Sequence, residues 1–565
     1  MPDTRRQAEP VTIRLAAAYG ALIALAAFGL FSNLDDRLLW GDEAETAVLA
    51  VNITRFGVPR VDDGRNIIAN LRGAADSNDA GIWTWSPWLD EYLTAGSFLV
   101  FGPSTLSARM PFAAAALASA LLLARLAFRC TRRHEIALIA LALYATCVPL
   151  LLHARQARYY AVLALAQLWL MHGLSRVLKS GPGASSPSEG TDAATARAES
   201  RDSIIGALHI SLALTVLFYC NYIAVPANLA ALAGVGFAVW YRTRRPPVAL
   251  AVAGFGFAAL ATPWLAYSAP SGQLGSLGFG HFWSSLAYYA GEIHFHLVPW
   301  VVLALPVAAF AMQRLGGEKL RRGATHASES DLSARSEGSE LPARSEGSEL
   351  PGGLELFIWL LLLASLLVYS LSPLRFFRYL MPLVPPLMLL SAVLIVRHIR
   401  PRWARAALVA ALVSSNGIAI AAAPLGSLHR FESPYASFTR SITREYNERL
   451  GDVLAFLEEH AEAGQTIWVA DPEFPLMFYT ELRIIDARYH PFPEEPPEWV
   501  FGTSASGVAN RRPLEVPAGV RTLYRETPLE VRRSRRSGNI PNPHTHAWFE
   551  VAASESELMP IYRKR

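Results

Sequence analysis

The sequence predicts a polytopic α-helical membrane protein with a small α/β domain at its C-terminal end. Hydrophobic residues make up 52% of the 565 residues and charged residues only 17%, whereas soluble domains carry about 25% charged residues. Apolar runs of about 17 to 22 residues recur along the first three quarters of the chain, and each is long enough to cross a bilayer as a helix. After about residue 425 the composition becomes polar.

The apolar runs predict about eleven transmembrane helices. The first follows Arg5, Arg6 and Arg14, and we expect it to be a retained span rather than a cleaved signal peptide, because no small-residue cleavage site precedes Asp35. The expected spans are residues 15–32, 107–125, 135–152, 159–176, 203–219, 223–241, 248–267, 293–313, 354–371, 379–396 and 404–424. An odd number of spans places the two ends on opposite sides.

Basic residues fall in alternate loops, on the same side as the N-terminus. They lie within 125–133, 176–179, 242–245, 314–322 and 397–405. By the positive-inside rule this side is cytoplasmic. We therefore expect a multi-pass protein of the plasma (inner) membrane with a cytoplasmic N-terminus, and with residues 33–106 and the C-terminal domain outside the cytoplasm.

The predicted boundaries divide the chain into a transmembrane domain (1–425) and an extracytoplasmic α/β domain (426–565). The first outer loop, 33–106, contains an interfacial helix at 92–101. Two low-complexity loops, 180–202 and 315–353, are expected to be disordered on the cytoplasmic side. In the C-terminal domain the pattern predicts a helix at 440–462 and short strands at 466–470, 483–486, 522–525 and 548–552.

Composition argues against a nucleic-acid-binding protein and against a protein built on disulfides or cysteine metal sites. The net charge of +4 gives no reason to expect a nucleic-acid partner, and the three cysteines show neither a disulfide framework nor metal-type spacing. Membrane lipids are the expected surroundings of the chain.

The stretch Trp40-Gly41-Asp42-Glu43-Ala44-Glu45 follows the first span directly. One interpretation is structural: Asp42 would be the N-cap of a helix, with Glu45 at its third position. The functional interpretation is that a carboxylate at the membrane edge acts as a general base. Both can hold together, because a capped helix start holds a carboxylate rigidly.

Five arginines lie on the side where basic residues should be few: Arg109, Arg155, Arg158, Arg375 and Arg378. Each alone could extend to the interface, but several together indicate an anion there, since guanidinium groups bind phosphate oxygens in pairs. A phosphate at membrane depth indicates a lipid phosphate. Tyr159 and Tyr379 lie beside these arginines and are expected to flank the lipid.

The segment Glu292-Ile293-His294-Phe295-His296 alternates an acid with two imidazoles. If extended, it would place Glu292, His294 and His296 on one side as ligands for a divalent metal. Interfacial histidines satisfied by hydrogen bonds are the alternative, and no cofactor is firmly predicted.

Several motifs resemble the GT-C superfamily of polyprenyl-phosphate-sugar-dependent glycosyltransferases, in the branch of protein O-mannosyltransferases and lipid A aminoarabinose transferases. They are the pair Asp42-Glu43 after the first span, Ala108-Arg109-Met110-Pro111, Gln156-Ala157-Arg158-Tyr159, and Arg378-Tyr379-Leu380-Met381-Pro382. The resemblance covers roughly residues 10–425 and implies the GT-C fold.

It also implies an inverting transfer of a hexosyl or pentosyl group from a polyprenyl phosphate to a protein, lipid or glycan hydroxyl. Asp42 would be the base, Glu43 would orient it or contact the acceptor, and the five arginines would bind the donor phosphate. Two alternatives stay open: a flippase or transporter of a polyprenyl-linked substrate, and a non-catalytic assembly protein.

Overall fold

The structure is a computed structural model, and it describes most of the transmembrane helices and much of the C-terminal region. The described residues are 12–68, 76–179, 193–268, 278–312, 350–372, 374–415, 433–443, 449–469, 474–487, 490–503, 514–532 and 556–565.

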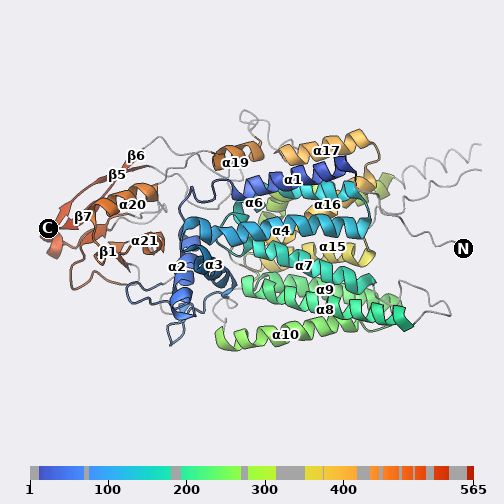
Figure 1. Cartoon of the computed structure of the whole chain (residues 1–565), viewed down its shortest axis with the longest axis horizontal. Helices are drawn as coiled ribbons and strands as arrows, with labels where there is room; N and C mark the ends of the chain where they lie inside the picture. The colour runs from blue at the N-terminus through green and yellow to red at the C-terminus, as the bar shows by residue number, and fades with distance from the viewer. Residues whose placement is uncertain are drawn as a thin grey trace, which may run out of the picture.

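A bundle of long apolar helices forms the larger part of the molecule (Figure 1). Among the described residues, eight helices are long and apolar enough to cross a membrane, so the protein is a multi-pass membrane protein. They are α1 (Ile13–Phe31), α4 (Thr105–Thr131), α7 (Tyr160–Lys179), α8 (Ala193–Cys220), α9 (Ala224–Thr243), α10 (Val248–Ser268), α15 (Gly352–Ser370), and the 3₁₀-helix η4 (Phe377–Leu383) continued by α16 (Val384–His398).

Two further helices are long and apolar enough to cross a membrane only when taken together, and they form either a broken span or a re-entrant loop. Helices α5 (His134–Ala145) and α6 (Val148–Ala154) are bent by 63° at the break between them. Pro149 lies at the start of α6, where its missing N–H costs nothing because the first amides of a helix have no intrahelical acceptor.

The expected eleven spans are not all present as continuous helices. Residues 293–313 are broken: the π-helix η2 (Ile293–Leu297) ends at an extended Val298, and α13 (Trp300–Leu303) starts anew after Pro299. Proline cannot donate to the preceding turn, which accounts for the break. The last expected span is described only as α17 (Arg402–Ser415), and residues 416–424 lie outside the described part.

The first low-complexity loop is shorter than expected. Helix α8 begins at Ala193, so residues 193–202 are helical. Their alanine, arginine and glutamate residues favour a helix and continue directly into the apolar run. Residues 180–192 and 313–349 lie outside the described part.

Helices α7 and α8 cross closely because a glycine of each helix faces the other. A Cβ at Gly173 would lie 2.9 Å from the carbonyl oxygen of Gly206, and a Cβ at Gly206 equally close to that of Gly173. Small residues at such crossings let helix backbones approach in a bilayer. In the same bundle Gln167 of α7 and Asn228 of α9 exchange two side-chain hydrogen bonds of 3.0 Å, fully buried.

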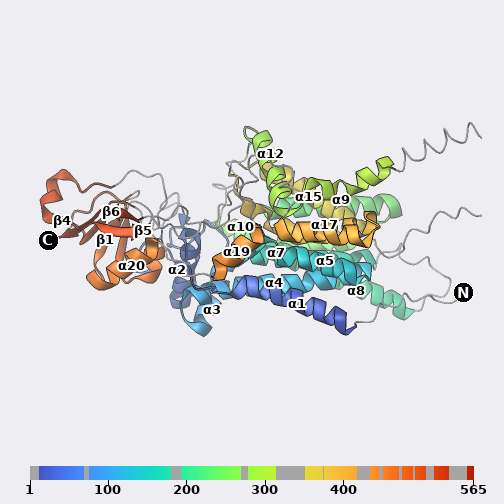
Figure 2. The same cartoon turned by 90° about the horizontal axis from the view of Figure 1, so that it is seen from above.

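Helices α2 (Gly41–Phe56) and α3 (Leu89–Phe101) lie at one end of the bundle, with α2 running across the direction of the long helices (Figures 1 and 2). Neither is among the candidate spans. The expected interfacial helix at 92–101 is thus present as α3, and it starts three residues earlier. At the same end the short helices α12 (Phe282–Glu292) and η2 follow α10 in the chain.

The C-terminal region is an α/β unit beyond α2 and α3 (Figure 2). Its five-stranded sheet has the order β2-β1-β3-β7-β4, parallel between β1, β2 and β3 and antiparallel on either side of β7. A second sheet pairs β5 with β6. The elements are α19 (Pro434–Thr443), α20 (Arg449–His460), β1 (Thr466–Val469), α21 (Phe474–Tyr479), β2 (Arg483–Asp486), β3 (Trp499–Phe501), the 3₁₀-helix η6 (Ala518–Leu523), β4 (Tyr524–Glu526), β5 (Leu529–Arg532), β6 (Ser556–Met559) and β7 (Ile561–Lys564).

The sheet is built on apolar residues of the predicted strands, such as Ile467 and Ile484, which are nearly or fully buried. Trp499, equally buried, belongs to β3, a strand that the sequence analysis did not predict. The single helix expected at 440–462 is present as two helices, α19 and α20, and the strand expected at 548–552 lies outside the described part.

Candidate active site

The start of α2 places the carboxylates of the Asp42-Glu43 pair in different surroundings. The N-cap is Trp40, not Asp42, and Glu43 rather than Glu45 is the third helical residue. The Glu43 carboxylate accepts a long hydrogen bond of 3.5 Å from the Trp40 N–H. Asp42 keeps a side chain that is one-third exposed, whereas Glu43 is fully buried.

Glu43 forms a two-pronged ion pair with Arg109 of α4. The Nε–Oε1 and Nη2–Oε2 distances are 2.8 and 2.7 Å, and the Ala157 N–H also donates to Oε1 at 2.8 Å. The remaining donors of Arg109 bind the carbonyls of Leu34, Arg37 and Leu38. All five N–H groups of this guanidinium are therefore engaged, and it has no donor left for a phosphate.

Arg155 is engaged in a similar way at the end of α1. Its Nη1 donates to the carbonyls of Gly29 and Leu30, and its Nη2 to those of Ser32 and Asn33. These are carbonyls of the last turn of α1 and just beyond, which have few helical partners of their own. In this structure the donors of Arg109 and the Nη groups of Arg155 are engaged by the protein itself, and phosphate binding by these two arginines stays a prediction.

Arg158 is buried among acidic side chains. Its Nη1 lies 2.8 Å from Thr46 Oγ1, 3.1 Å from the Asp42 carbonyl and 3.4 Å from Glu45 Oε1, and its Nε lies 4.0 Å from Asp90 Oδ2. Arg158 thus connects α2 to α3. Its Nε is buried and has no hydrogen-bond partner among the described residues.

Burial raises the pKa of Glu45 to about 8, although Arg158 opposes the shift. Burial likewise raises the pKa of Asp90 and, further, that of Glu91, on which the neighbouring Asp90 acts in the same direction. Oε2 of Glu91 has no hydrogen-bond partner among the described residues. This end of α3 is thus a desolvated acidic cluster that shares one arginine.

Arg378 lies beside Asp42. Its Nη1 donates to Asp42 Oδ2 at 2.7 Å and lies 3.4 Å from the hydroxyl of Tyr160, and its guanidinium carbon stands 4.1 Å from the centre of the Phe376 ring. Its Nε is buried and has no hydrogen-bond partner among the described residues. Arg378 therefore keeps an unpartnered N–H group, whereas every N–H group of the Arg109 guanidinium is engaged.

Arg375 is exposed and lies further out, where it binds the hydroxyls of Ser284 and Ser285 on α12. Tyr159 is buried and its hydroxyl accepts a hydrogen bond of 2.8 Å from Asn221. Tyr379 is half-buried with its ring next to Phe376 and Tyr369. Both tyrosines belong to the surroundings of Arg378, because Tyr159 packs on Tyr160 and Tyr379 packs on Phe376, and both of these rings contact Arg378.

The three residues considered as metal ligands do not converge. Residues 293–297 form a π-helix rather than an extended strand. His296 Nε2 lies 3.6 Å from Glu292 Oε2, whereas His294 Nδ1 accepts the N–H of Trp300. Within the described part of the chain, no group of three or more His, Cys, Asp or Glu side chains is arranged to hold a metal ion, and these residues do not fit one.

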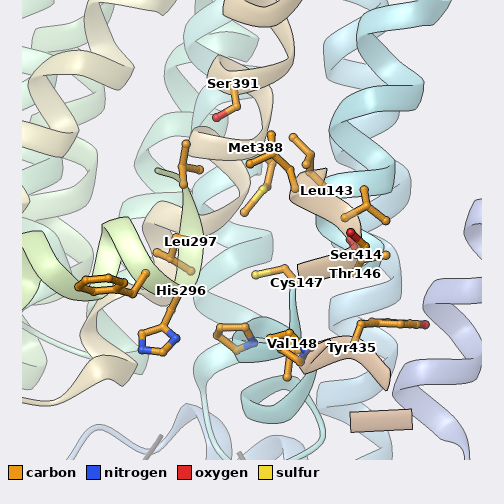
Figure 3. Close-up of a pocket in the computed structure, with 16 residues that line it drawn as sticks. Leu143, Thr146, Cys147, Val148, His296, Leu297, Met388, Ser391, Ser414 and Tyr435 are labelled. Atoms are coloured by element: carbon orange, nitrogen blue, oxygen red, sulfur yellow. The ribbon is translucent and has the colours of Figure 1, made fainter. Parts of the chain in front are cut away.

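A mostly apolar cavity lies next to this region, between the bent α5–α6 pair, η2, α16 and α17 (Figure 3). Leu143, Cys147, Leu297 and Met388 line it, and the ring of His296 stands at one end. That ring also contacts Phe377, the residue before Arg378, at a centroid distance of 5.8 Å. His296 thus links the lining of the cavity to Phe377, the neighbour of Arg378 in the sequence.

Sequence reasoning missed several residues of this site. Asp90 and Glu91 carry a signal, because two adjacent acids occupy the first turn of a helix that is otherwise mostly apolar. Tyr160 and Asn221 carry none that a single sequence provides. The site as a whole combines one exposed carboxylate, one aromatic-flanked guanidinium and a buried network that fixes both.

Comparisons with known proteins give structural neighbours only. No family model matches the chain, and no curated protein does. Solved structures with a similar fold include ArnT from Cupriavidus metallidurans bound to undecaprenyl phosphate, at 14% identity over 86% of this chain and 93% of that chain, with a TM-score of 0.48. The archaeal oligosaccharyltransferase AglB from Archaeoglobus fulgidus, in complex with an inhibitory peptide and a dolichol-phosphate, matches at 11% identity over 84% and 64%, with a TM-score of 0.40.

A further structure of the archaeal enzyme is described as a complex with Zn and sulfate. At these identities and TM-scores the likeness concerns general architecture, and the functional conclusion depends on the residues of the site.

Proposed function

We propose that this chain is an inverting membrane glycosyltransferase. It transfers a sugar from a polyprenyl-phosphate donor to a hydroxyl acceptor on the extracytoplasmic face. The observation that carries the proposal is the contact between the partly exposed Asp42 carboxylate and Arg378 at 2.7 Å. A base and a cation lie side by side at one end of a membrane bundle.

In the proposed reaction Asp42 takes the proton of the acceptor hydroxyl as its oxygen attacks the anomeric carbon. The bond between that carbon and the phosphate oxygen breaks, and polyprenyl phosphate leaves with the electron pair. Because a phosphate ester leaves readily, the site needs a cation for the developing charge rather than an acid. Arg378 supplies it, with Arg375 further out.

The remaining charged residues act through these two. Glu43 and Arg109 fix the helix start that carries Asp42, Arg155 holds the end of α1, and Arg158 joins α2 to α3. No step of this scheme uses a metal.

The surroundings suit a lipid-linked donor. Phe376, Phe377, Tyr159 and Tyr379 lie around Arg378, and the cavity of Figure 3 offers an apolar surface for part of an isoprenyl chain. The positive-inside pattern supports a cytoplasmic N-terminus, with α2, α3 and a C-terminal domain from about residue 426 on the opposite face.

The test is sugar transfer by the purified protein in lipid nanodiscs, from a panel of polyprenyl-phosphate hexoses and pentoses to peptide, lipid and glycan acceptors. Asp42→Asn is expected to lower kcat by at least about 100-fold, since a general base contributes about 10²–10⁴, while donor binding persists. Asp62→Asn, an exposed aspartate of the same outer segment, is the matched control and keeps wild-type transfer.

Two results would contradict the proposal. Equal transfer by wild type and Asp42→Asn would show that the base is elsewhere. Movement of an intact lipid-linked donor across liposomes, with no new glycosidic bond, would identify a transporter instead.

A further inference from the structure

The connection between α1 and α2, residues 33–40, determines where the Asp42 carboxylate lies. Three carbonyls of this connection accept hydrogen bonds from Arg109, and Arg109 in turn holds Glu43. Since Glu43 is the neighbour of Asp42 in the first turn of α2, a shift of the connection would move Asp42 with respect to Arg378.

Tyr479, the last residue of α21, reaches this connection from the C-terminal region. Its hydroxyl accepts a hydrogen bond of 2.9 Å from the Leu39 N–H and lies 2.6 Å from Thr105 Oγ1. Thr105 is the first residue of α4, one turn before Arg109 on the same helix. Burial raises the pKa of the Tyr479 phenol, so at neutral pH it keeps the proton that it can donate to Thr105.

The helix that carries Tyr479 is itself held in place. Helix α21 packs against α2, and Phe478 stacks on Phe98 of α3 with ring centroids 6.0 Å apart. The buried side chain of Asn66 donates to the Leu482 carbonyl and accepts from the Ile484 N–H at 2.7 Å, which attaches the edge of the sheet to the first outer segment. The phenol therefore stands at a defined position.

Helix α19 holds the first half of the same connection. The Asn33 side chain donates to the carbonyl of Ile442 at 3.0 Å, and Arg37 Nη2 donates to Ser441 Oγ at 3.1 Å. Residues after 430 thus contact the connection near both of its ends, and Tyr479 is the contact nearest to α2.

We propose that Tyr479 is a positioning residue for the transfer reaction: by joining Leu39 to the start of α4, it keeps Arg109 and Glu43 in the register that places Asp42 beside Arg378. This inference rests on the proposed function. It gives the C-terminal α/β region a part in the geometry of the active site.

The experiment compares Tyr479→Phe with Tyr524→Phe in the full-length protein in nanodiscs. Tyr479→Phe keeps the ring and removes both hydrogen bonds. Tyr524→Phe removes a comparable hydrogen bond, from a buried hydroxyl to the Pro497 carbonyl at 2.7 Å, inside the sheet region itself. The measurements are kcat and donor KM, thermal unfolding, and amide hydrogen exchange of residues 33–40.

We expect Tyr479→Phe to lower kcat roughly tenfold with donor KM changed less than about twofold, because a misplaced reacting group slows the chemical step more than it weakens binding. Exchange in residues 33–40 should rise in this variant only. Tyr524→Phe should keep the wild-type kcat, and both variants should unfold at similar temperatures.

Unchanged kcat in Tyr479→Phe would overturn the inference, and so would an equal decrease in both variants, since that indicates a general loss of packing. If the wild type transfers no sugar from any donor, the proposed function fails. In that case hydrogen exchange still tests the positioning role of Tyr479. Unchanged exchange at residues 33–40 in Tyr479→Phe rejects this role, and increased exchange supports it.

Discussion

Asp42 and Arg378 are 336 positions apart in the sequence, yet an oxygen and a nitrogen of their side chains lie 2.7 Å apart. One belongs to the helix after the first span and the other to the 3₁₀-helix η4, which leads into α16. The contact therefore exists only when most of the bundle has assembled around it. Arg109 and Arg155, at the same end of the bundle, bind backbone carbonyls instead.

Substitution of Arg378 should affect catalysis, whereas substitution of Arg155 should affect stability. Arg378→Gln is expected to lower kcat/KM for the donor by about 100-fold, because it removes the charge that stabilises the leaving phosphate, with little change in thermal stability. Arg155→Gln should instead lower the unfolding temperature, since four carbonyls at the end of α1 lose their donor. Kinetics with a polyprenyl-phosphate sugar and differential scanning fluorimetry measure the two effects. Normal catalysis by Arg378→Gln would count against its role.

Replacing either Glu43 or Arg109 alone should strongly destabilise the protein, because the two form a buried ion pair. Glu43→Gln or Arg109→Met is expected to lower the free energy of unfolding by about 3–5 kcal/mol, since each leaves an uncompensated buried charge. The double variant should lose less than the sum of the two. Denaturant unfolding in micelles and the resulting double-mutant cycle give the coupling energy. Additive losses would show that the two side chains do not interact.

Stability should fall as the pH rises through neutrality. The pKa of Glu45 is raised from 4.5 to about 8, so between these values the folded state holds a proton that the unfolded state releases. The stabilisation is complete below about pH 4.5 and is lost as the pH approaches 8. Unfolding temperatures from pH 5 to 8 should decline less steeply in Glu45→Gln, whose side chain does not titrate. Glu458→Gln, an exposed residue of α20, should keep the wild-type slope.

The glycine crossing of α7 and α8 should tolerate no side chain. In Gly206→Ala the new Cβ would meet the Gly173 carbonyl at 2.9 Å, and overpacking of this kind costs about 1–3 kcal/mol. In Gly254→Ala of α10 the Cβ would meet nothing within 4 Å, which makes it the matched control. Thermal unfolding and folded yield in membranes should fall for the first variant alone. A stable Gly206→Ala would mean that the helices pack less closely than described.

Hydropathy was sufficient to predict most of the spans and the class of fold, because twenty apolar residues have few alternatives to a helix in a bilayer. It failed at residues 293–313, where Pro299 interrupts a run that composition alone makes continuous. The short strands at 466–470 and 483–486 were predicted within a residue, since their apolar residues are bounded by polar turns.

For the candidate site, the sequence indicated where the arginines lie but not what each of them binds. Sequence position indicated that arginines gather at the outer end of the bundle, but it does not tell which of them bind backbone carbonyls. Arg109 and Arg155 do so, because the connection after α1 happens to present its carbonyls to them. Tyr479 lies more than 430 positions from Asp42 in a region of different composition, and no local pattern identifies a contact of that kind.

The hydrogen-bonded pair of Gln167 and Asn228 affects the position of Tyr160, at the start of α7. Two reciprocal hydrogen bonds between neighbouring helices prevent either from turning about its own axis. Helix α7 begins at Tyr160, about two turns from Gln167, and a helix of this length turns as one rod. The two amides therefore set the rotation of α7 about its axis, and with it the direction in which the Tyr160 hydroxyl points toward Arg378. The orientation of this site residue thus depends on contacts inside the bundle as well as on the outer loops.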